Sequence, residues 1–193
     1  MKIRMNDGWE FAKLPLGSSL TDAEKADFQP VDLPHDWLIW QANDLYESAD
    51  AWYMREMEIT GDPELPVTLL SFDGVYMDCD VLLNGEVVYT HPYGYTAFLV
   101  PLTGKLLPGK NRLMVHIRHR SPNSRWYSGS GVFRDVSLIR LPENHLVPDG
   151  LAVRTEEAEN GWQLTLTAET EGQEGVACRC ALRDADGKTV SET

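Results

Sequence analysis

Apolar and polar residues alternate along several short segments of this 193-residue chain, the pattern of β-strands with one buried face. Strand patterns of this kind, or runs of β-branched and apolar residues, occupy residues 52–59, 67–72, 77–83, 112–118 and 132–141. Asn84-Gly85 separates two apolar runs and predicts a two-residue hairpin, because both central positions of a type I′ turn need a positive φ. Many short strands with tight turns predict an all-β sandwich.

Only residues 20–28, opening at Ser19 or Thr21, have the composition of a helix. Because this segment is short and acidic, the sequence predicts a minor role for it in the fold.

A change of composition at residues 142–150 predicts a boundary after a first domain of residues 1–141. The boundary segment is rich in turn-forming residues and is predicted as a linker. Beyond it, residues 151–154, 162–167 and 176–183 predict about three strands. An immunoglobulin-like domain takes about 100 residues. Residues 151–193 are therefore predicted to be a truncated immunoglobulin-like domain, and the chain to be a piece of a longer protein.

Composition disfavours several classes of function. The formal net charge of −13 disfavours binding to the phosphate backbone of nucleic acids. No apolar run reaches the roughly 18 residues of a membrane helix, and residues 1–7 carry no secretory signal. Three cysteines are too few for a disulfide framework, which predicts a reducing, cytoplasmic setting. The histidines and cysteines lack metal-site spacing, so we expect no metal and no cofactor.

Seven motifs occur in a defined order along the first 141 residues. They are Asn6-Asp7-Gly8-Trp9-Glu10-Phe11, Val31-Asp32-Leu33-Pro34-His35-Asp36-Trp37, Ala51-Trp52-Tyr53-Met54-Arg55, Phe72-Asp73-Gly74-Val75, Leu83-Asn84-Gly85, His91-Pro92-Tyr93-Gly94-Tyr95-Thr96-Ala97-Phe98, and the segment 123–136 with Asn123-Ser124-Arg125-Trp126-Tyr127 at its start. In this order the chain resembles the N-terminal sugar-binding domain of family 2 glycoside hydrolases, the β-galactosidase and β-glucuronidase family.

The resemblance implies a fold and a parent enzyme. The first domain would be a jelly-roll, galactose-binding-like β-sandwich, and the tail would be the start of the immunoglobulin-like domain that follows it. The parent would be a retaining β-glycosidase, most readily a β-galactosidase, whose catalytic barrel this chain lacks. The chain would help to shape the pocket for a β-linked sugar and would pack against that barrel.

The loop of residues 121–131 is the first candidate site. Loops of about ten residues in a tightly turned β-domain usually have a function. Asn123, Arg125, Trp126 and Tyr127 are residue types that sugar sites and domain interfaces use, and both readings stay open. The resemblance implies that the loop reaches toward the barrel pocket. Related enzymes carry a carboxylate near the position of Arg125, so Asn123 could take the polar role.

Three other segments have two readings each. By resemblance Asp50, just before the Trp52 strand, could contact the sugar, or it could belong to a solvated acidic loop. In the 33–37 motif, Trp37 could stack on a pyranose, or His35 and Asp36 could bond locally while Trp37 packs in the core. The rings of segment 91–95 could face a sugar or brace a loop.

No catalytic residue is assigned. Retaining glycosidases use two carboxyl groups about 5 Å apart, and by resemblance both are glutamates of the barrel, so we expect this chain to be inactive. Two alternative functions are a free-standing carbohydrate-binding module and a structural collar without sugar affinity. The apolar faces of the strands in residues 151–183 also predict a homodimer through this region.

Overall fold

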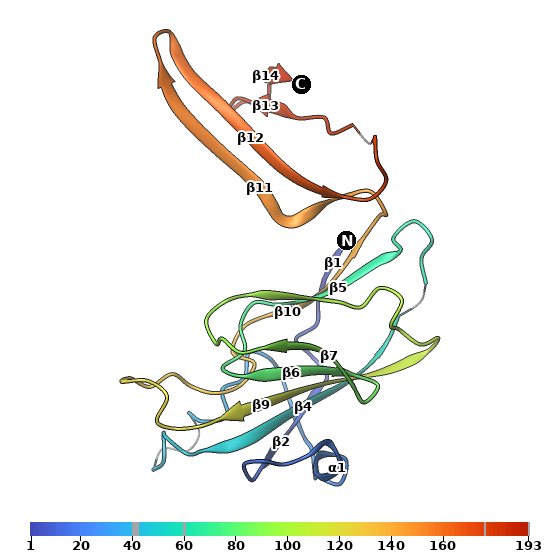
Figure 1. Cartoon of the computed structure of the whole chain (residues 1–193), viewed down its shortest axis with the longest axis vertical. Helices are drawn as coiled ribbons and strands as arrows, with labels where there is room; N and C mark the ends of the chain where they lie inside the picture. The colour runs from blue at the N-terminus through green and yellow to red at the C-terminus, as the bar shows by residue number, and fades with distance from the viewer. Residues whose placement is uncertain (40–42, 60, 176, 193) are drawn as a thin grey trace. The chain divides into compact units, whose positions relative to one another are not determined.

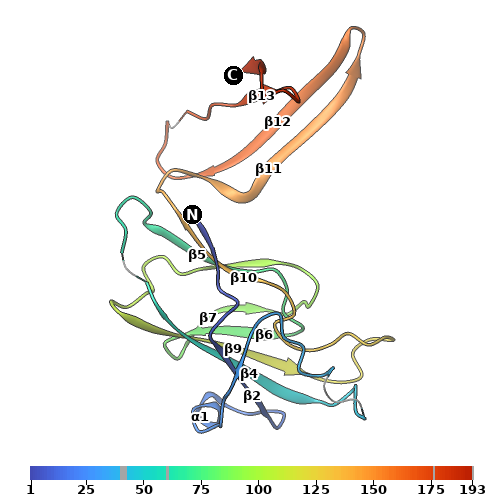
Figure 2. The same cartoon turned by 180° about the vertical axis from the view of Figure 1, so that it is seen from behind.

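The computed structural model describes residues 1–39, 43–59, 61–175 and 177–192, and it divides into two compact units, Met1–Leu141 and Pro142–Thr193. Figures 1 and 2 show the strands from opposite sides. The prediction of an all-β chain with a sandwich as its first part is confirmed.

The first unit consists of two antiparallel sheets. The four-stranded sheet has the order β1 (Lys2–Arg4), β10 (Val136–Leu141), β5 (Val67–Phe72), β8 (Phe98–Pro101). The six-stranded sheet has the order β3 (Gln29–Val31), β2 (Trp9–Leu14), β4 (Ala49–Glu58), β9 (Lys110–His119), β6 (Cys79–Leu83), β7 (Glu86–His91). The main apolar core takes side chains from both sheets, among them Tyr53, Phe72 and Val115.

Strand β4 is covered on both faces, and large apolar side chains therefore point to either side of it. Tyr53 and Met57 point into the main core. Trp52 points to the opposite face, where it joins Leu82, Met114 and the fully buried Ala23 in a second apolar cluster. This second cluster would be open to water if nothing covered it.

The cover is the short helix α1, Leu20–Ala23, which Figure 1 shows beside β2. It begins at Ser19, whose hydroxyl accepts a hydrogen bond from the Asp22 amide, while the Asp22 carboxylate accepts one from the Ser19 amide. This capping box satisfies two amides that a helix start leaves free. The helix is shorter than the segment 20–28 predicted for it, and its Ala23 closes the second cluster.

The strand after the 121–131 loop is shorter than predicted. Strand β10 begins at Val136, whereas the sequence predicted a strand from residue 132. Val132 is fully buried although it lies outside β10. The chain there runs beside the segment around His35, whose amide donates a hydrogen bond to the Val132 carbonyl.

The second unit contains two antiparallel hairpins. They are formed by β11 (His145–Ala158) with β12 (Gly161–Glu171), and by β13 (Ala181–Arg183) with β14 (Thr189–Glu192). Residues 145–150, predicted as linker, are therefore the start of a strand that bends at a register shift between Leu146 and Leu151. Of the strand predicted at 176–183, only residues 181–183 form one, and Val176 lies outside the described residues.

The hairpin predicted at Asn84-Gly85 is confirmed. Leu83 pairs with Glu86, and the two turn residues have φ values of 53° and 89°. The left-handed backbone at both positions is what a type I′ turn requires.

We expect Gly85→Ala to destabilise the protein by roughly 1–2 kcal/mol, because an L side chain is strained at this φ. Chemical denaturation monitored by tryptophan fluorescence measures the change. Gly61→Ala is the matched control, since its φ is not left-handed and its Cβ would meet open space. Equal free energies of unfolding for the two variants would contradict this account of the turn.

Candidate functional site

The loop between β9 and β10 projects beyond the end of the six-stranded sheet, as the yellow segment in Figure 1 shows. Its returning half is held by backbone hydrogen bonds to two other segments. The His35 amide donates to the Val132 carbonyl at 2.8 Å, and the Trp37 amide donates to the Ser130 carbonyl at 3.0 Å. Tyr76 and Gly131 exchange both of their backbone hydrogen bonds, at 2.9 and 3.0 Å. The loop is therefore a braced structure.

Two glycines allow this close approach. Gly129 has a φ of 72°, and a Cβ there would lie 2.6 Å from Oδ2 of Asp36. Gly131 has a φ of 140°, and a Cβ there would collide with the carbonyl oxygen of His35. Any other residue would push the loop away from the 35–37 segment.

The carboxylate of Asp36 joins the loop to the rest of the unit. Its Oδ1 accepts hydrogen bonds from the amides of Ser130 at 2.9 Å and Leu38 at 3.1 Å, and its Oδ2 accepts one from the Tyr127 hydroxyl at 2.7 Å. Burial and this donation to a carboxylate raise the pKa of Tyr127, so the phenol stays protonated.

Trp37 lies below the loop and is only 3% exposed. Its indole N–H donates to the Ser130 hydroxyl at 3.0 Å. The prediction that Trp37 packs in the core is therefore correct, because a buried ring has no face for a sugar. The prediction of local bonding is wrong for the main partners, since Asp36 accepts from Tyr127 and Ser130 and His35 lies against Tyr53.

Two histidines complete the floor beneath the loop. His35 Nδ1 lies 2.8 Å from the hydroxyl of buried Tyr53. His119 packs edge-on against Trp37, with ring centroids 5.9 Å apart, and its Nδ1 has no hydrogen-bond partner among the described residues. Burial lowers the pKa of both histidines, against a smaller opposing effect of Asp36. The floor is therefore built of neutral rings around one carboxylate.

The structure brings four of the five predicted site residues together on this loop. Asn123 is half-buried and bonded within it: its Oδ1 accepts from the hydroxyls of Tyr76 at 3.2 Å and Ser128 at 3.1 Å. Tyr127 is half-buried on Asp36. Arg125 and Trp126 are the two exposed members, and Trp126 is 60% exposed.

Asp50, the fifth predicted site residue, is buried away from solvent and is not part of this loop. It is 1% exposed, and its Oδ2 accepts hydrogen bonds from the Gly17 amide at 3.0 Å and the Ser18 hydroxyl at 3.1 Å. The same oxygen lies 3.1 Å from Nε2 of His116, whose ring stacks on Trp52. Neither predicted reading describes this position, since Asp50 is a buried acceptor that fixes the segment leading into α1 rather than a solvated acid.

A second loop contacts this one, and the sequence did not predict that contact. Tyr93 and Tyr95, in the segment between β7 and β8, are 55% and 41% exposed. The hydroxyl of Tyr95 accepts a hydrogen bond from the Trp126 indole N–H at 3.1 Å. The sequence signal was the Tyr-Gly-Tyr run, which could equally have been an internal brace.

In the described ranges, no three histidine, cysteine, aspartate or glutamate side chains are grouped so that they could hold a metal ion. The described helix is too short and too polar to cross a membrane. Cys79 is fully buried, and this burial raises the pKa of its thiol to about 12.

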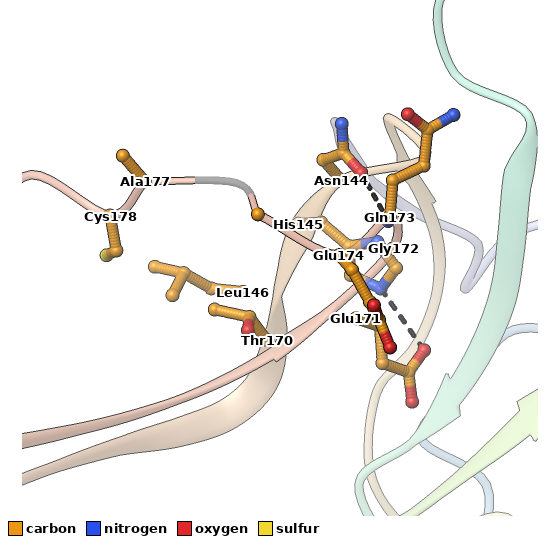
Figure 3. Close-up of a pocket in the computed structure, with 11 residues that line it drawn as sticks. Asn144, His145, Leu146, Thr170, Glu171, Gly172, Gln173, Glu174, Ala177 and Cys178 are labelled. Atoms are coloured by element: carbon orange, nitrogen blue, oxygen red, sulfur yellow. Dashed lines mark hydrogen bonds and ion pairs between the residues drawn. The ribbon is translucent and has the colours of Figure 1, made fainter.

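A cavity of about 400 Å³ lies in the second unit, between the start of β11 and the end of β12 (Figure 3). The Oδ1 of Asn144 accepts a hydrogen bond from the Gln173 amide at 2.8 Å, and His145 Nε2 lies 3.6 Å from Glu171 Oε2. Both pairs join the start of β11 to the end of β12, where His145 is the register partner of Glu171.

Comparison with known proteins identifies the family of this chain. The family described as "Glycosyl hydrolases family 2, sugar binding domain" matches residues 19–142. The β-galactosidase BoGH2A of Bacteroides ovatus is 32% identical over 209 aligned positions, which cover 97% of this chain and 24% of that protein. A β-glucuronidase of Bacteroides fragilis is 26% identical over 161 positions, covering 76% of this chain and 21% of that protein.

Solved structures share the fold along the whole chain. A β-glycosidase from Bacteroides vulgatus superimposes with a TM-score of 0.82 at 27% identity, covering 100% of this chain and 27% of that structure. This chain therefore belongs to the glycosyl hydrolase family 2 proteins and contains their sugar-binding domain. It spans about a quarter of the length of BoGH2A.

We expect Asp36→Asn to destabilise the protein by about 1–3 kcal/mol, because its NH2 group would replace Oδ2 and leave the half-buried Tyr127 hydroxyl without an acceptor. Thermal and chemical unfolding measure the loss. Asp32→Asn, an exposed position in the same motif, is the control and should be neutral. A neutral Asp36→Asn variant would show that the loop is not held by this carboxylate.

Proposed function

We propose that this chain is the non-catalytic sugar-binding part of a retaining β-glycosidase that acts on β-galactosides, and that the 121–131 loop forms one wall of its substrate pocket. The observation that carries the proposal is the exposure of Arg125 and Trp126 on a loop whose base is fixed by Asp36. A braced loop can hold a guanidinium and an indole in place at small entropic cost when a ligand arrives. The catalytic carboxyl pair would belong to another part of the enzyme.

The choice of galactosides rests on similarity. BoGH2A, at 32% identity, is a β-galactosidase, whereas the B. fragilis β-glucuronidase is 26% identical. An exposed guanidinium can donate to a sugar hydroxyl or to a uronate carboxylate, so Arg125 does not separate the two substrates.

A titration with methyl β-galactoside and methyl β-glucuronide tests the proposal. We expect the indole N–H signal of Trp126, assigned with Trp126→Phe in ¹⁵N-resolved NMR spectra, to move with a Kd above about 1 mM, since one open wall encloses little of a sugar. The galactoside should bind more tightly. The exposed Trp162 supplies a control signal within the same spectrum.

Other outcomes would select the alternatives. A micromolar Kd would favour a free-standing carbohydrate-binding module, and a Trp126 signal that no sugar moves would favour a structural collar. Hydrolysis of an aryl β-galactoside that follows the protein through purification would overturn the non-catalytic assignment.

We further propose that the chain works in the cytoplasm and that it forms a homodimer through residues 151–183. The three free cysteines support a reducing compartment. The register of β11 with β12 puts Leu151, Val153, Leu164 and Trp162 on one face of the hairpin, and all four side chains are exposed. Apolar faces and free strand edges of this kind favour pairing with a second copy.

Light scattering over a range of concentrations tests the dimer. Leu164→Glu should shift the protein toward monomer, because it places a charge on the apolar face. Thr165→Glu puts the same charge on the opposite face and should leave the association unchanged. A wild-type protein that stays monomeric at high concentration would contradict the proposal.

A further inference from the structure

Four aromatic rings from separate segments form one surface in the first unit, which we call the aromatic platform: Tyr76, Tyr93, Tyr95 and Trp126. Tyr95 is its centre. Its ring contacts Tyr76 at a centroid distance of 5.2 Å and Tyr93 at 5.8 Å, both edge to face. Its hydroxyl accepts the hydrogen bond from Trp126. The platform therefore joins the 92–97 segment to the candidate sugar-contacting loop.

The platform is held from below. A Cβ at Gly94 would collide with the Tyr76 ring, so the absence of a side chain there lets the 92–97 segment lie directly on that ring. The Tyr76 hydroxyl donates to Asn123 Oδ1 at 3.2 Å, which ties the same ring to the second loop. Edge-to-face pairs of this kind contribute beyond their buried area, so the ring positions are set before any ligand arrives.

The upper rings remain open to solvent. Tyr93 and Trp126 are 55% and 60% exposed, although each is fixed by a contact to Tyr95. The indole N–H of Trp126 is already used within the platform, and no stacked ring partner of Trp126 occurs among the described residues. What it offers to a ligand is a ring face.

Two of the three segments that form the platform carry no acidic residue, whereas Asp78 lies two residues after Tyr76 in the third. The whole chain has 30 acidic residues, yet the segments 91–98 and 119–134 contain none. The second of them contains Arg120, Arg125 and Arg134. Ring faces beside phenol hydroxyls and a guanidinium suit a ligand that has both apolar C–H faces and hydroxyl edges, and that carries no positive charge.

We propose that the aromatic platform binds the additional pyranose rings of a β-linked oligosaccharide, next to the sugar that the 121–131 loop contacts. This rests on the proposed sugar-binding function and extends it, since it assigns Tyr93 and Tyr95 as contact residues and makes the preferred ligand longer than one sugar. Rings that are fixed side by side on two loops offer contacts to successive sugar units, whereas a site for one sugar needs only the first loop.

The test compares methyl β-galactoside with β-linked galactobiose and galactotriose, using the full chain and the Trp126 indole signal. Affinity should rise by about three- to tenfold from the monosaccharide to the disaccharide, as expected for one added aromatic contact. Tyr93→Ala should remove this gain, and Tyr93→Phe should keep most of it because the ring remains. Val87→Ala, a similarly exposed apolar residue on β7, is the control.

The outcomes separate this inference from the function on which it rests. Binding that depends on Trp126 but gains nothing with chain length, or is unchanged in Tyr93→Ala, overturns the platform proposal and leaves the sugar-contacting loop intact. Absence of any sugar-dependent shift at Trp126 overturns both. Thermal unfolding of each variant confirms that its fold is retained.

Discussion

The antiparallel pairing of β4 with β9 determines most of the first unit. The register runs without a shift from Ala49 opposite His119 to Glu58 opposite Lys110. Because successive side chains point to opposite faces, this one register puts Tyr53 in the main core and stacks Trp52 on His116 at the outer face. It also ends β9 at His119, directly below the loop that carries the exposed indole. A slip of one residue would exchange the two faces and move the base of the loop.

Local features of the fold could be predicted from the sequence, whereas features made by distant segments could not. The turn at Asn84-Gly85 depends on two adjacent residues with left-handed backbones, so its signal is complete in the sequence. The role of α1 depends on the outer face of the six-stranded sheet, which is built from distant segments. The four residues of the helix therefore do not predict that it covers Trp52. The start of β11 at His145 was hidden for the same reason, because turn-forming residues there occupy a bent strand held by its pairing with β12.

The candidate site follows the same division. The loop and its exposed residues Arg125 and Trp126 could be predicted, because a long loop rich in arginine, aromatic residues and glycine stands out in a tightly turned sheet protein. Asp50 could not be placed, since an acidic residue before a strand looks the same whether it faces solvent or accepts hydrogen bonds from Gly17 and Ser18. Tyr93 and Tyr95 were named as possible sugar contacts, but only the structure joins them to Trp126.

The braced base and the open upper surface suit a part that completes a pocket rather than encloses one. Asp36 fixes the loop through three donors, and the neutral rings beneath it leave no second charge to compete for them. Such a wall loses little freedom on binding, but it excludes little water, and tight binding of small ligands requires both. Its contacts would therefore gain strength when another surface closes over the sugar and lowers the local dielectric. A rigid, exposed loop is therefore suited to act with a partner surface. Its open, braced form explains both the fixed positions of its side chains and the low affinity for sugar that we expect of the loop alone.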